Sequence, residues 1–148
     1  MILAMRDANA CFTELTLNTS TLHDPKIMKL VAAMLDKNSS VTKLDLSNCG
    51  ITDIGIAFLM KGKKKKKSTL FVLFFEYLSN EGLVNHPRIR YLDVSGNKLG
   101  SSRASADLFV WASRTKSLEV FKMARTEMGQ KSCKDVAALL EDPASIIK

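Results

Sequence analysis

The chain has few of the residues on which catalytic and metal-binding sites are usually built. Its 148 residues include only three cysteines and two histidines. Cys11, Cys49 and Cys133 lack the paired spacing of a zinc site, and such a scattered, odd set is typical of a reducing compartment. His23 and His86 have no cysteine or aspartate nearby in the arrangement that a nucleophilic triad needs. We therefore expect no enzyme activity, no metal and no cofactor.

The sequence also lacks a long apolar run and an evident secretion signal. Met1–Met5 is too short and has no basic start. The run Leu70–Phe75 has far fewer residues than are needed to cross a bilayer. With 46% apolar and 25% charged residues, the composition is that of one ordinary globular domain. The scattered cysteines lead us to expect that domain in the cytoplasm.

An evenly basic surface is missing as well, although the formal net charge is +7. Five of these charges come from one run, which leaves the rest of the chain close to neutral. The expected strands show no alternation of aromatic and basic residues, so we expect no nucleic-acid partner. The run consists of Lys63, Lys64, Lys65, Lys66 and Lys67.

What the chain does have is one spacing written four times. Apolar residues stand at the first, fourth, sixth and eleventh positions, and a small polar or weakly polar residue stands at the ninth. This is the spacing of a leucine-rich repeat, in which a strand and a turn alternate with a helix. The copies are Phe12-Leu15-Leu17-Ser20-Leu22, Val41-Leu44-Leu46-Cys49-Ile51, Ile89-Leu92-Val94-Asn97-Leu99 and Leu118-Phe121-Met123-Thr126-Met128.

The physical demands of this spacing define the fold. Leu44, Asp45 and Leu46 alternate inward and outward, as a strand requires. The short side chain at the ninth position of each copy can bond turn backbone inside the coil, where unpaired polar groups are costly. Residues 12 and 41 are 29 apart, as are residues 89 and 118, which leaves room for a helix in each copy. We predict an α/β leucine-rich repeat solenoid, a horseshoe fragment with parallel strands on its concave face and helices on its convex face.

Helix starts can be read from the same pattern. Asp24 followed by Pro25 is a good N-terminal cap and first turn. Asp53 can cap the next helix, Ser105 or Asp107 can start a third, and Ser132 can cap the last. We expect Trp111 to lie in the core.

We interpret residues 1–148 as a single domain and as a piece of a longer array, because Ile2, Leu3 and Met5 look like the tail of a preceding helix and the sequence ends without a polar cap. The expected repeats are 12–40, 41–88, 89–117 and 118–148, with 1–11 as the end of a preceding repeat and 61–82 as an insertion. Three interpretations of the insertion stay open: a retained intron, a plain surface loop, or a contact with anionic lipid through Lys63–Lys67.

Four segments resemble one particular family of leucine-rich repeat proteins. Leu44–Cys49 (LDLSNC), Tyr91–Asn97 (YLDVSGN), Asp107–Ser113 (DLFVWAS) and Lys116–Val120 (KSLEV) resemble the leucine-rich repeat region of the CARMIL family, the capping protein, Arp2/3 and myosin-I linkers. The resemblance implies ribonuclease-inhibitor-like repeats in a regulator of actin assembly. It also implies a role in cell migration and lamellipodia, at the cytoskeleton or the inner face of the plasma membrane.

The chain is therefore expected to be a non-enzymatic scaffold for a protein of the actin machinery. The alternative is a generic adaptor or sensor module, as in innate immune receptors or ubiquitin-ligase adaptors. The carboxylates of Asp45 and Asp93 are expected to be solvated or paired with Lys43 and Lys122, and Tyr91 is the best candidate anchor. The expected partner-binding residues are Glu14, Thr16, Asn18, Lys43, Asp45, Ser47, Tyr91, Asp93, Ser95 and Lys122.

Overall fold

A computed structural model describes residues 12–18, 22–61, 82–100 and 103–141. Four short strands alternate with the helices along this part of the chain. The strands are β1 (Glu14–Thr16), β2 (Lys43–Asp45), β3 (Tyr91–Asp93) and β4 (Val120–Lys122). The helices are α2 (Pro25–Lys37), α3 (Asp53–Lys61), α4 (Arg103–Arg114) and α5 (Gln130–Glu141), with a 3-10 turn at Leu83–Asn85.

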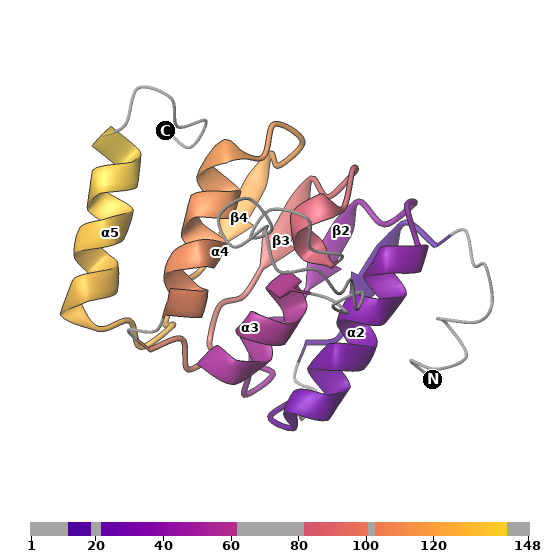
Figure 1. The fold of residues 1–148 in the computed structure, drawn as a ribbon, viewed down its shortest axis with the longest axis horizontal. Helices are drawn as coiled ribbons and strands as arrows, with labels where there is room; N and C mark the ends of the chain where they lie inside the picture. Colours follow the sequence, from indigo (N-terminus) through magenta and orange to yellow (C-terminus); the bar gives the residue numbers. More distant parts are fainter. Residues whose placement is uncertain (1–11, 19–21, 62–81, 101–102, 142–148) are drawn as a thin grey trace, which may run out of the picture.

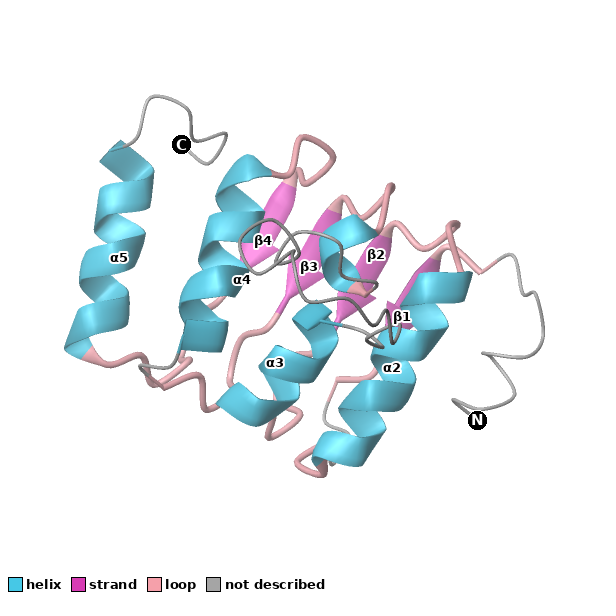
Figure 2. Ribbon diagram, in the orientation of Figure 1, coloured by secondary structure: helices cyan, strands magenta, loops and turns pink. Residues whose placement is uncertain are grey.

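The strands form one parallel sheet in the order β1-β2-β3-β4. The helices line up beside one another on one side of that sheet, with α2 at one end of the row and α5 at the other (Figures 1 and 2). This confirms the prediction of an α/β leucine-rich repeat solenoid.

The strand register stacks one apolar residue from each repeat into a shared interior. Leu15 is paired with Leu44, Leu44 with Leu92, and Leu92 with Phe121. Leu44 and Leu92 are fully buried, while Phe121 on the edge strand β4 is partly buried and lies against Phe109, with ring centroids 6.2 Å apart. Each repeat therefore supplies a wall of the core for its neighbour.

The ninth residue of the pattern bonds turn backbone, as its chemistry predicted. Asn97 is fully buried, accepts hydrogen bonds from the amides of Cys49 and Ile51, and donates to the carbonyls of Leu46 and Val94. The thiol of Cys49 donates to the Leu17 carbonyl.

The equivalent Thr126 is also buried, and its hydroxyl donates to the Met123 carbonyl. Ser20 lies outside the described residues. These bonds pair backbone groups of the turns inside the core, where unpaired polar groups are costly.

Helix starts were predicted less well than the repeat itself. Asp24 caps α2, where its carboxylate accepts from the Lys26 amide at 2.8 Å, and Pro25 opens the helix as expected. The start of α4 at Arg103 corrects the proposed starts at Ser105 and Asp107. The start of α5 at Gln130 corrects the proposed cap Ser132.

Both serines that were wrongly predicted to start helices make hydrogen bonds between repeats. Ser105 is buried and donates to the Asp53 carboxylate of α3, 2.5 Å away. Ser132 is also buried and donates to the Gly100 carbonyl at 3.2 Å. A buried hydroxyl needs a partner, and here the partner comes from the preceding repeat. Trp111 lies in the core, as predicted.

No helix in the described residues is long and apolar enough to cross a membrane. The expected preceding repeat at 1–11 lies outside the described residues. The insertion expected at 61–82 does as well, apart from its end residues Lys61 and Gly82. Its three interpretations therefore stay predictions.

Candidate protein-interaction surface

The outward side chains of the four strands form two rows across the sheet. Parallel strands lie about 4.8 Å apart, so residues in register are neighbours on one face. We call this face, on the side of the sheet away from the core, the concave face. Its first row is Glu14, Lys43, Tyr91 and Val120, and its second row is Thr16, Asp45, Asp93 and Lys122.

Tyr91 stands at the centre of this surface. The Nζ atom of Lys43, on β2, lies 5.7 Å from the centroid of the Tyr91 ring, and that of Lys122, on β4, lies 5.3 Å from it. The Tyr91 hydroxyl donates to the Asp93 carboxylate at 3.2 Å. A partly buried aromatic ring is thus flanked by two ammonium groups, an arrangement stabilised by the attraction of cations to the ring face.

The two lysines are held in their charged forms. A hydrogen bond and ion pair with Glu14, 3.0 Å away, raises the pKa of Lys43 above its usual value. Interaction with the Tyr91 hydroxyl, aided by the charges of Asp93 and Asp45, raises the pKa of Lys122. These neighbours favour the charged form of both ammonium groups, which lysine already has at neutral pH. Lys43 pairs with Glu14 on the neighbouring strand, which differs from its expected pairing with an aspartate.

Asp45 and Asp93 serve the turns that follow their strands. The Asp45 carboxylate accepts from the amide of Ser47 at 3.0 Å and from its hydroxyl at 2.7 Å. The Asp93 carboxylate accepts from the Ser95 amide at 2.9 Å, and Asp93 is buried. These are local turns of the kind that aspartate side chains favour.

Asp45 and Asp93 were expected to be solvated or paired with lysine, and their hydrogen bonds to the following turns correct that expectation.

Ser95 also makes a hydrogen bond within the solenoid, because its hydroxyl accepts from the Ala124 amide at 3.0 Å. Four of the predicted binding residues thus make hydrogen bonds within the solenoid: Asp45, Ser47, Asp93 and Ser95. Glu14, Thr16 and Asn18 are exposed, while Lys43 and Tyr91 are half-buried and Lys122 is exposed.

One member of the first row was missed by the sequence reasoning. Val120 is 39% exposed, although most large apolar side chains among the described residues are buried, and it pairs in register with Tyr91. Its position in the fourth copy matches that of Lys43 in the second, so the repeat alignment could have found it. It extends the surface beside Tyr91 with an apolar contact area.

The surface is suited to binding. Within the described ranges, no group of three or more His, Cys, Asp or Glu residues is placed to hold a metal ion. The proposed lipid-contact residues, Lys63–Lys67, lie outside the described ranges. A partly buried ring with fixed charges around it can anchor a protein partner, because tyrosine is among the residues enriched in binding hot spots.

Comparison with known proteins agrees with the repeat fold. A family model described as a leucine-rich repeat matches residues 37–60. Among curated proteins, none matches the sequence significantly.

Two solved structures share the architecture. A structure titled "Leiomodin-1 Actin-Binding Site 2 (ABS2)" is 16% identical, with a TM-score of 0.66, over 95% of this chain and 70% of that one. The tropomodulin C-terminal domain from Caenorhabditis elegans is 14% identical, with a TM-score of 0.53, over 95% of this chain and 89% of that one. At such identities the likeness establishes the fold, and this chain has the architecture of a leucine-rich repeat domain.

Proposed function

We propose that the chain is a non-enzymatic interaction module that binds a protein of actin assembly through its concave face. The observation that carries the proposal is Tyr91, held between Lys43 and Lys122 on a sheet face open to solvent. The ring supplies apolar contact area, and the charges on either side supply orientation.

The choice of an actin-related partner has two supports. One is the shared fold with a structure whose title names an actin-binding site of leiomodin-1. The other is the resemblance of Leu44–Cys49 and Tyr91–Asn97 to the CARMIL repeats. We propose a regulator of the capping-protein-linker type, acting in the cytoplasm at the actin cytoskeleton, in cell migration and lamellipodia.

A direct binding assay tests this function. The full chain, fluorescently labelled at its exposed Cys133, would be titrated with monomeric actin, actin filaments and capping protein in separate experiments. Saturable binding to at least one of the three is expected. Absence of binding to all three, with the chain shown to be folded by circular dichroism, would contradict the actin-related proposal.

A further inference from the structure

A second surface lies beside the concave face, along the edge where the chain enters the strands. It is a hollow of about 510 Å³ lined by residues that immediately precede β2, β3 and β4, together with the turn after α4. Its volume falls within the range of specific ligand sites. The lining residues are Thr42, Pro87, Arg88, Arg90, Lys116, Ser117 and Glu119. We call it the basic hollow.

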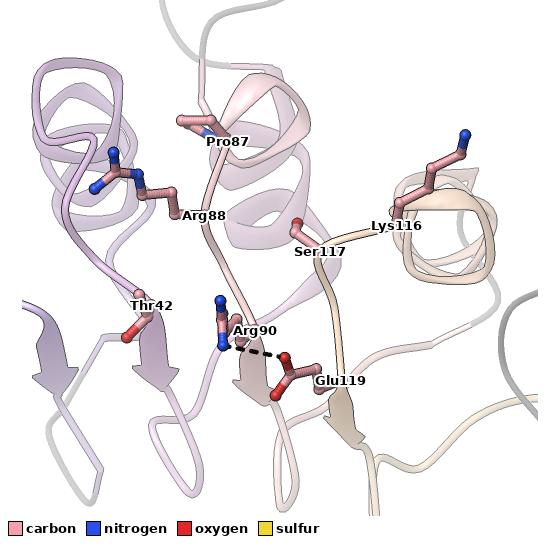
Figure 3. Close-up of a pocket in the computed structure, with 7 residues that line it drawn as sticks. All are labelled: Thr42, Pro87, Arg88, Arg90, Lys116, Ser117 and Glu119. Carbon is pink, nitrogen blue, oxygen red and sulfur yellow. Dashed lines mark ion pairs between the residues drawn. The ribbon is translucent and has the colours of Figure 1, made fainter.

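The hollow has a net positive charge. Three of its lining residues are cationic and one, Glu119, is anionic. The guanidinium of Arg90 pairs with the Glu119 carboxylate at 3.3 Å, and both side chains are more than half exposed. In Figure 3, Arg88 and Lys116 lie on opposite sides of the hollow, with this ion pair between them. Arg88 and Lys116 thus provide the excess positive charge.

The backbone that carries these cations is fixed by the fold. The Arg90 amide donates to the Thr42 carbonyl at 2.8 Å, and the Arg90 carbonyl accepts from the Glu119 amide at 2.8 Å. The strand ladder therefore continues through the floor of the hollow. A site whose backbone is already ordered loses less conformational freedom when a ligand binds.

The two walls are fixed as well. On one side, the Arg88 amide donates to the buried ring of His86 at 3.4 Å, and that ring also bonds the Asn38 carbonyl. On the other side, the Leu118 amide donates to the Thr115 carbonyl at 3.1 Å and closes the turn that contains Lys116. Each wall is thus held by hydrogen bonds that do not involve the charged groups themselves.

We propose that the basic hollow binds an acidic segment of a protein partner. Its cations are separated across the hollow, so they do not converge on one point as a site for a single small anion would require. An extended peptide can instead place separate carboxylates near Arg88 and Lys116. The Glu119 carboxylate between them disfavours a continuous phosphate backbone, and none of the lining residues is aromatic to stack a base.

This surface goes beyond the proposed function, since none of its lining residues belongs to the two rows of the concave face. A partner that reaches both surfaces would gain affinity from the second contact without any change in the first. The hollow also defines the chemistry of that contact, which is a segment rich in aspartate or glutamate.

The test uses a fluorescent oligoglutamate peptide and a matched pair of variants of the full chain. Arg88→Glu/Lys116→Glu reverses two charges in the hollow. Lys26→Glu/Lys134→Glu reverses two exposed charges on α2 and α5 and changes the net charge equally. Both variants keep the Lys63–Lys67 run, so any attraction of the peptide to that run is the same in both.

We expect the hollow variant to bind the peptide roughly tenfold more weakly than the control variant, since two exposed ion pairs contribute up to about fivefold each. Raising the salt concentration should weaken the wild-type binding. An equal loss in the two variants would overturn the proposal, because it would indicate attraction by net charge alone. Circular dichroism on both variants checks the fold, and Arg88→Gln/Lys116→Gln serves if the reversal disturbs it.

Two further arms exclude other sources of negative charge. Inorganic phosphate should not displace the peptide at concentrations where sodium chloride of equal ionic strength does not. Vesicles containing phosphatidylserine should bind the hollow variant and the control variant alike. Specific displacement by phosphate, or vesicle binding lost only in the hollow variant, would overturn the assignment of an acidic peptide as the occupant.

Discussion

Asn97 reaches back one repeat and holds the backbone of Cys49, whose amide donates to the Asn97 side-chain oxygen at 3.1 Å. The same oxygen accepts from the Ile51 amide at 2.9 Å, and the Asn97 side-chain nitrogen donates to Leu46 and Val94 at 2.8 Å each. One buried amide thus satisfies polar groups of two successive turns. It joins the repeats through hydrogen bonds where Leu44 and Leu92 join them through apolar contact.

Asn97→Ala should lower the free energy of unfolding by about 3 kcal/mol, because it leaves several buried backbone groups without partners. Urea unfolding followed by circular dichroism measures the change. Gln130→Ala removes a similar amide from an exposed position and is the control. A loss below about 1 kcal/mol for Asn97→Ala would show that the turn does not depend on this side chain.

Leu92→Ala should destabilise the chain by about 2–5 kcal/mol, because the leucine is fully buried between neighbouring repeats. Leu140→Ala makes the same chemical change on α5, where the side chain is 52% exposed, and should cost less than about 1 kcal/mol. Comparing the two by chemical unfolding tests the shared core. Equal effects would contradict the stacking of Leu44, Leu92 and Phe121 into one interior.

Acidification should weaken the fold through His86. Burial lowers the pKa of this ring below its ordinary value of 6.5, although its bond to the Asn38 carbonyl opposes the shift. The unfolded chain therefore takes up a proton more readily than the folded one, and stability is lost as the pH falls below about 6.5, toward the lower pKa of the folded ring. His86→Gln should flatten this part of the stability profile. A profile that His86→Gln does not alter would refute the account.

Tyr91→Ala should weaken binding to the actin-related partner by at least about fivefold, because it removes the central ring of the concave face. The unfolding midpoint should change little, since the ring is only partly buried. Ile54→Ala on α3 removes an exposed apolar side chain from the helix layer and is the control. Equal affinity for Tyr91→Ala and the wild type in the same titration would remove Tyr91 as the anchor.

The repeat spacing was enough to predict the solenoid, because each position in the repeat must either be buried in the core or bond the backbone of a turn. Leu44 and Leu92 must be buried, and Asn97 must bond the turn. Helix starts were harder, because Ser105 and Ser132 look like caps in the sequence yet bond groups from the preceding repeat. A contact between residues so far apart in the chain leaves no local signal.

The candidate surface was predicted in outline and corrected in detail. Alternation along the strands placed Glu14, Lys43 and Tyr91 on one face. That alternation could not show that the Asp93 carboxylate would accept a hydrogen bond from Ser95 in the turn that follows its strand. The basic hollow left no motif, because Arg88 and Lys116 come from different repeats and are brought to opposite sides of one hollow only by the coiling of the chain.

The most direct test of the concave face as the binding surface is hydroxyl-radical footprinting of the chain with and without saturating monomeric actin. Reduced oxidation of Tyr91, with Ile54 on the helix layer unchanged, is the result that we predict. Reduced oxidation of Ile54 with Tyr91 unchanged would place the partner on the helices and contradict the account.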